Sequence, residues 1–112
     1  MAKITTHVLD TARGKPARGV RIALDAIDGA AARPIAHGAT DDDGRLRTLT
    51  DPDGVGAGTY RLTFETGAYF AALGIESFFP LTQITFAVGD VGAHFHVPLL
   101  LAPFGYSTYR GS

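Results

Sequence analysis

Short runs of alternating apolar and polar residues, broken repeatedly by glycine or proline, are the feature that most constrains how this chain can fold. Its 112 residues include 14 Gly and 6 Pro. In the clearest run, the apolar residues Tyr60, Leu62 and Phe64 are separated by polar ones. Successive side chains of a strand point to opposite faces, so such a run is typical of a half-buried strand. Many short strands joined by glycine- and proline-rich turns predict an all-β sandwich or barrel.

The same pattern predicts about eight short strands and one short helix. The expected strands cover residues 4–10, 20–26, 35–40, 45–49, 60–65, 84–88, 94–101 and 106–110. Thr66 is placed to cap a helix over residues 67–73, and Gly74 to end it in the left-handed conformation. The run Asp41-Asp42-Asp43-Gly44 predicts a tight turn, because Asp tolerates turn geometry and Gly supplies positive φ.

Composition narrows the class of protein. A chain of this length predicts one domain, residues 1–112, with one modest core. The net charge of −1 gives no electrostatic attraction to nucleic acid or to a membrane surface. The absence of cysteine excludes disulfides and thiolate metal sites. No apolar stretch approaches the roughly 20 residues of a membrane span. No signal peptide is visible after Met1, so we expect a cytoplasmic protein.

The expected strand 94–101 is apolar on both faces. Phe95, Val97 and Leu99 share one face, while Leu100 lies on the other and Phe104 follows soon after. A strand with one solvated face should be polar on that face. We therefore expect the outer face to be covered, either by another subunit or by a packed loop.

Histidines are the first candidates for chemistry. His94 and His96 lie on one strand face at i, i+2, and His7 lies in the first expected strand. A single histidine, such as His37, is more often structural than catalytic. His-x-His also raises the possibility of zinc, with His7 as a third ligand, but zinc usually takes three or four protein ligands and no cysteine or acidic motif accompanies these residues. We expect no metal site and no cofactor.

Two arginines and the last residues complete the set of candidates. Arg45 and Arg47 could clamp an anion or a carbonyl group, although two solvated arginines are the commoner case. Ser112 lacks the sequence context of an activated nucleophile. The polar run Tyr109–Ser112 nevertheless follows a strongly apolar segment. Termini are ordinarily frayed, so this pattern indicates a terminus that is tied down and used.

Three blocks of the sequence carry a resemblance to a known family: residues 5–17 around His7, residues 40–45 ending at Arg45, and residues 94–112 from His-Phe-His-Val-Pro to the final Tyr-Arg-Gly-Ser. The chain resembles the transthyretin-related proteins, and among them the 5-hydroxyisourate hydrolases. The resemblance covers essentially the whole chain. Phe95 and Ala102 depart from the more usual Tyr and Ser, and neither matches a catalytic position.

The resemblance implies a transthyretin-like sandwich of two sheets, assembled as a homotetramer (a dimer of dimers) with active sites in a channel between dimers. It also implies that the strands carrying the site share one sheet. The implied reaction is hydrolysis of the cyclic amide of 5-hydroxyisourate. The resemblance assigns catalysis to His7, Arg45, His96 and Ser112, and substrate binding to His7, Arg45, Tyr109, Arg110 and Gly111. The alternative is a transthyretin-type carrier that binds a small molecule without chemistry, although carriers lack this set and the terminal tetrapeptide.

Overall fold

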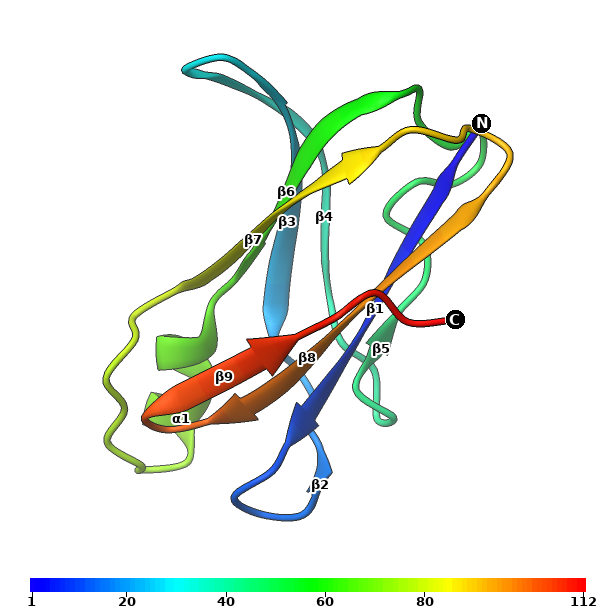
Figure 1. The fold of residues 1–112 in the computed structure, drawn as a ribbon. Helices are drawn as coiled ribbons and strands as arrows, with labels where there is room; N and C mark the ends of the chain where they lie inside the picture. Colours follow the sequence, from blue (N-terminus) through cyan, green and yellow to red (C-terminus); the bar gives the residue numbers. More distant parts are fainter.

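A computed structural model describes residues 1–112 and shows nine strands in two packed sheets (Figure 1). One sheet has the order β2-β1-β8-β9, and β5 also pairs with β1. Its strands are β1 (Lys3–Asp10), β2 (Lys15–Pro16), β5 (Arg45–Leu46), β8 (His94–Ala102) and β9 (Gly105–Thr108). The other sheet has the order β4-β3-β6-β7. Its strands are β3 (Arg21–Asp28), β4 (Ala31–Ala39), β6 (Gly58–Phe64) and β7 (Thr82–Val88).

The central pairing joins the two ends of the chain. β1 and β8 run parallel in unbroken register from Lys3 opposite His94 to Asp10 opposite Leu101. All other strand pairs are antiparallel. Parallel neighbours need a long crossover, and here that crossover contains the whole second sheet. The expected architecture of two packed sheets is confirmed.

The core lies between the sheets and contains 20 buried apolar residues. The alternating positions Tyr60, Leu62 and Phe64 are all buried, as the sequence predicts. In β8, Phe95 and Leu99 are also buried while His94 is exposed. The histidines of this strand therefore face outward, and the alternation of the sequence is sufficient to explain which face packs inward.

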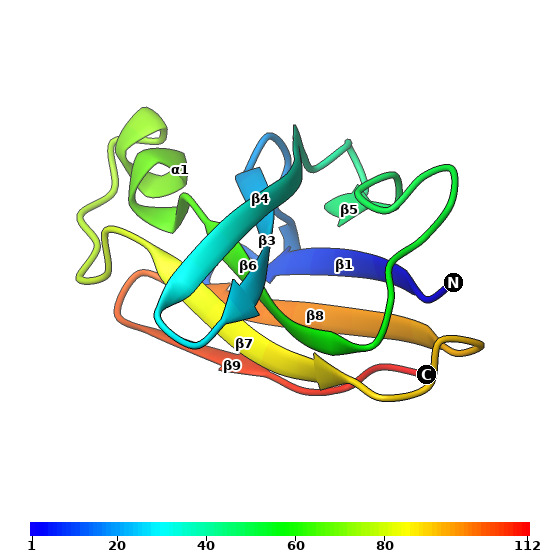
Figure 2. The same cartoon turned by 90° about the horizontal axis from the view of Figure 1, so that it is seen from above.

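The single helix, α1 (Thr66–Ala72), lies at one end of the sandwich (Figure 2). The prediction that Thr66 caps it is wrong. Glu65 occupies the N-cap position without a side-chain cap, and the buried Thr66 hydroxyl lies 3.1 Å from that of Thr82 in β7. A buried hydroxyl needs a partner, and the neighbouring strand supplies one better than the helix does. Gly74 follows the helix with φ of +71°, as predicted. No helix of the fold has the length and apolar character needed to cross a bilayer.

Strand boundaries differ from the prediction where alternation is weak. β4 begins at Ala31 instead of residue 35, because small residues there show no pattern but still pair with β3. β9 spans Gly105–Thr108, two residues short of the predicted end at Arg110. β5 ends at Leu46 instead of residue 49. No strand is predicted between residues 10 and 20, but the short strand β2 lies there and pairs with the end of β1.

A buried polar contact fastens α1 to the first sheet. The Tyr69 hydroxyl donates a 2.8 Å hydrogen bond to Oδ2 of Asp10, which is fully buried at the end of β1. The backbone N–H of Arg13 donates to Oδ1 of the same carboxyl group. Burial, and then this bond to Asp10, raises the pKa of Tyr69. The hydroxyl therefore stays protonated and keeps its role as donor.

We expect Tyr69→Phe to lower the free energy of unfolding by about 1–3 kcal/mol, because it leaves a buried carboxyl oxygen without its donor. Urea denaturation at neutral pH measures this loss. Tyr106→Phe is the matched control, since Tyr106 is partly exposed and its hydroxyl makes no hydrogen bond within the chain. Equal stability of the two variants would show that the Asp10 contact does not contribute.

Candidate active site

The first sheet gathers most of the candidate residues on its outer face. Its cleft has a volume of about 150 Å³ and is lined by polar and charged residues only. The lining residues come from β1, β5, β8 and the end of the chain: Thr5, Thr6, Arg45, Arg47, His94, His96 and Ser112. His7, Arg45 and His96 lie on β1, β5 and β8, so the expectation that their strands share one sheet is confirmed. Neighbouring strands bring together residues that are far apart in sequence.

His96 is the most perturbed group of the cleft. Its side chain is half-buried, and its Nδ1 lies 2.7 Å from the Thr5 hydroxyl. Burial lowers the pKa of His96, and the positive charge of Arg45 lowers it further, with smaller contributions from His94, His7 and Arg47. Both causes disfavour the imidazolium form. His96 is therefore neutral at physiological pH and can accept a proton.

His7 lies beside the cleft on β1, directly opposite Arg45 of β5. Its Nε2 lies 2.9 Å from the backbone carbonyl oxygen of Asp43. A carbonyl oxygen only accepts, so Nε2 of His7 must carry the proton. This contact holds the ring against the turn that precedes β5. His7 is thus oriented by the Asp43 carbonyl, whereas the ring of His96 is oriented by a side chain.

The turn before β5 places Arg45. Oδ1 of Asp41 accepts 2.9 Å hydrogen bonds from the backbone N–H groups of Asp43 and Arg45. The bond from Arg45 is the main cause of the lowered pKa of Asp41. Gly44 has φ of +76°, and a Cβ there would lie 2.4 Å from the Val8 carbonyl oxygen. Only glycine lets the turn approach β1 this closely.

The last five residues are held against β8. The Thr108 hydroxyl donates to the Pro98 carbonyl oxygen at 2.8 Å, and the Gly111 N–H donates to the His96 carbonyl oxygen at 2.8 Å. The guanidinium of Arg110 lies 4.4 Å from the centre of the Phe95 ring, a cation–π contact. The segment then runs towards β1 and β5 (Figure 1). The expectation of a terminus that is tied down is confirmed.

The predicted residues do not all lie in the cleft. Ser112 lines it, and Gly111 packs so tightly on His96 that a Cβ would lie 2.6 Å from the ring Cδ2. Tyr109 and Arg110 instead line a separate, mostly apolar hollow over Phe95 and β7. Sequence reasoning missed Thr5. Its only sequence signal is its position two residues before His7, on the same strand face.

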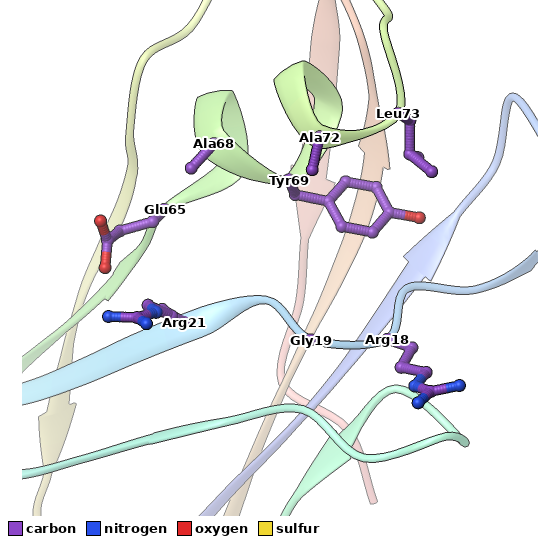
Figure 3. Close-up of a pocket in the computed structure, with 8 residues that line it drawn as sticks. All are labelled: Arg18, Gly19, Arg21, Glu65, Ala68, Tyr69, Ala72 and Leu73. Atoms are coloured by element: carbon purple, nitrogen blue, oxygen red, sulfur yellow. The ribbon is translucent and has the colours of Figure 1, made fainter.

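Another hollow lies between α1 and the segment that enters β3 (Figure 3). Arg18, Arg21 and Glu65 supply its charged groups, and the ring of Tyr69 lies between the helix and Gly19. It shares no residue with the cleft of the first sheet and contains no histidine. It has therefore no side chain suited to proton transfer near neutral pH.

The cleft is not arranged as a metal centre. No group of three His, Cys, Asp or Glu side chains is placed to hold an ion. Nε2 of His94 and Nδ1 of His96 both lie 2.7 Å from the Thr5 hydroxyl. The two ring nitrogens therefore form hydrogen bonds with one oxygen atom and are not directed at a common ion. The polar groups present are an imidazole that can accept a proton and arginines that can stabilise negative charge.

We expect the pKa of His96, measured by NMR titration, to lie below that of a free histidine side chain. Arg45→Gln should raise it, because one neighbouring positive charge is removed. Arg47→Gln is the matched control and should raise it less, since Arg47 contributes less than Arg45. Because burial is the larger cause, neither variant should restore the ordinary value. Equal shifts in both variants would contradict this ranking.

Comparisons with known proteins are consistent with this geometry. Residues 4–111 match the model of the HIUase/Transthyretin family. The 5-hydroxyisourate hydrolase 2 of Rhizobium meliloti is 45% identical over 98% of this chain and 96% of its own length. The 5-hydroxyisourate hydrolase of Deinococcus radiodurans is 45% identical over 97% and 95%.

Solved structures agree in fold. That of Klebsiella pneumoniae 5-hydroxyisourate hydrolase superposes with a TM-score of 0.89 at 45% identity and covers 100% of both chains. Sea bream transthyretin, solved in complex with thyroxine, has a TM-score of 0.91 at 29% identity and covers 97% of this chain and 94% of its own. The same fold therefore occurs in a hydrolase and in a protein solved with a bound hormone.

Proposed function

The chain belongs to the HIUase/Transthyretin family, and from this membership we propose that it hydrolyses 5-hydroxyisourate to 2-oxo-4-hydroxy-4-carboxy-5-ureidoimidazoline. The observation that carries the proposal is the meeting of His96, Arg45 and Ser112 in one cleft. Residues 1–112 act as one hydrolase domain, since both sheets share a single core. The proposed reaction uses no cofactor, because His96 and Arg45 supply the base and the positive charge that attack by water requires.

Water activation is assigned to His96. Attack on a carbonyl carbon requires a base that removes a proton from water, and an imidazole is suited to this near neutral pH. The lowered pKa of His96 keeps it unprotonated and ready to accept. His7 lies beside the cleft, whereas His96 lines it, which favours His96 as the base. His7 then serves to bind substrate and assist proton transfer.

Charge stabilisation is assigned to Arg45. Negative charge develops on the carbonyl oxygen as water attacks, and a guanidinium is always charged and donates several hydrogen bonds in one plane. One well-placed donor to such an oxygen is worth roughly 3–4 kcal/mol. Arg45 lines the cleft with its backbone anchored by Asp41. Arg45 therefore both binds substrate and lowers the barrier.

The end of the chain completes the site. Ser112 lines the cleft and is assigned to positioning water or substrate. The hydrogen bond from the Gly111 N–H to the His96 carbonyl oxygen holds Ser112 beside β8. Tyr109 and Arg110 lie over Phe95 and β7, outside the cleft. Their assigned part in substrate binding is therefore to fix the segment that carries Ser112.

His96→Ala should fold normally and lose at least about 100-fold in turnover, the range of general-base catalysis. The assay generates 5-hydroxyisourate from urate with urate oxidase and follows the decay of its ultraviolet band against the spontaneous rate. His37→Ala is the matched control, since His37 is an exposed histidine of β4 in the other sheet. Near-normal turnover of His96→Ala would overturn the assignment.

The second candidate is a small-molecule carrier, which the likeness to sea bream transthyretin in complex with thyroxine favours. The same assay separates the two functions. A carrier would not speed the decay of 5-hydroxyisourate above background. It would also tolerate removal of residues 109–112, whereas the proposed hydrolase should lose its activity. A folded protein with only background decay would favour the carrier.

We also propose a homotetramer, a dimer of dimers. β7 and β9 lie at the same side of the sandwich with unpaired outer edges, which can pair with a second copy (Figure 2). The turn after β8 exposes Phe104, whose side chain is 66% accessible, and Leu100 on the outer face of β8 is only half-buried. Such apolar surface favours association.

Sedimentation equilibrium should give four chains per particle. Phe104→Asp should shift the distribution towards dimers, because it places a charge on the proposed apolar contact. Val91→Asp is the control, because Val91 is an exposed apolar residue of the turn between β7 and β8, away from the turn that holds Phe104. A monomer at micromolar concentration would refute the assembly without affecting the assignment of residues within the chain.

A further inference from the structure

Thr5 occupies a position that the mechanism above does not use. It lies opposite His96 in the parallel pairing of β1 and β8, and its side chain is only 3% exposed. Its hydroxyl lies 2.7 Å from Nδ1 of His96 and 2.7 Å from Nε2 of His94. One buried hydroxyl therefore joins two imidazoles, the half-buried His96 and the exposed His94.

Counting protons restricts the arrangement. A hydroxyl has one proton, so Thr5 can donate to only one of the two rings. Nδ1 of His96 faces Thr5, which leaves Nε2 as the only ring nitrogen that can take a proton from water. Nε2 must then be bare, and the single proton of the neutral ring must reside on Nδ1. It follows that His96 donates to Thr5, and that Thr5 directs its own proton to Nε2 of His94.

We propose that Thr5 is a positioning residue that holds His96 in the Nδ1–H tautomer, and that His94 orients the Thr5 hydroxyl for this task. The inference rests on the proposed function, because the proton count fixes the tautomer only if Nε2 of His96 takes a proton from water. The tautomer itself is measured on the folded protein, without any assay of activity. In this proposal Thr5 acts by deciding which nitrogen of His96 is free. Thr5 lines the cleft, but its hydroxyl is committed to the two histidines.

His94 gains a role of a different kind from His96. It accepts the Thr5 proton only while its Nε2 is bare. Once its Nε2 is protonated, His94 becomes a donor and can no longer accept a hydrogen bond from Thr5. The Thr5 hydroxyl is then no longer oriented to accept from His96. The charged and titratable groups that act on His96 are Arg45, His94, His7 and Arg47. Lys3 lies opposite His94 in the pairing of β1 with β8.

The first experiment reads the tautomer directly. ¹⁵N–¹H correlation spectra of the imidazole rings, recorded on the folded protein above the pKa of His96, should show the proton of His96 on Nδ1. Thr5→Val removes the hydroxyl at nearly constant shape and should move the population towards Nε2–H. Thr5→Ser keeps the hydroxyl and should retain the wild-type tautomer. An Nε2–H form in the wild-type protein would overturn the proposal.

Thr6→Val provides the matched control. Thr6 is the next residue of β1, fully buried, and its hydroxyl donates to the Val97 carbonyl oxygen. Its loss should lower stability without changing the tautomer of His96. If Thr5→Val and Thr6→Val shift the ring signals alike, the effect is general loosening of the sheet, and the positioning role is wrong.

Kinetics then test the consequence. Thr5→Val should lower kcat at least about tenfold with little change in KM, since a wrong histidine tautomer costs up to roughly 10⁴ in a Ser-His-Asp triad. Thr5→Ser should rescue kcat. A loss of kcat without a tautomer shift would overturn the proposal. A tautomer shift in a protein whose wild-type form shows no hydrolysis would uphold the role of Thr5 and refute only the proposed function.

Discussion

The parallel pairing of β1 with β8 is the constraint on which the site depends. β1 is a central strand of its sheet, with β8 on one side and β2 and β5 on the other. The register places Thr5 opposite His96 through β8, and His7 opposite Arg45 through β5. Successive side chains of a strand point to opposite faces, so a slip of one residue in β1 would turn both Thr5 and His7 to the other face. The buried Ile4, Val8 and Thr6 on the inner face hold this register.

Once the strands are paired, positive charge accumulates around a half-buried imidazole. Arg45 and Arg47 enter the same cleft as His96 and His94, and no carboxylate side chain lines it. This concentration of positive charge opposes protonation of His96 and favours binding of a negatively charged or strongly polarised ligand. Both effects favour the attack of water on a carbonyl group, because the base stays neutral and the negative charge on the carbonyl oxygen is stabilised.

Much of the fold is predictable from sequence, and the exceptions have physical causes. Tyr60, Leu62 and Phe64 alternate cleanly, and their strand is as expected. β4 begins earlier than predicted because Ala31 and Ala32 have no pattern of their own and depend on β3 for pairing. Thr66 fits a helix cap locally, but burial beside Thr82 decides its hydrogen bond. Thr5 gives only a weak signal in the sequence, its place on the strand face of His7, because its hydrogen-bond partners lie about ninety residues away.

The sequence by itself determined the class of fold, the inward face of β8 and the set of polar residues available for chemistry, because strand periodicity, turn residues and side-chain types are local properties. Only the tertiary structure decided that Ser112 enters the cleft while Tyr109 and Arg110 lie over Phe95. It also decided that the Asp43 carbonyl oxygen accepts a hydrogen bond from Nε2 of His7, and that one hydroxyl joins His94 to His96. These facts depend on the register between distant strands, and burial and hydrogen bonding set that register across the whole sandwich.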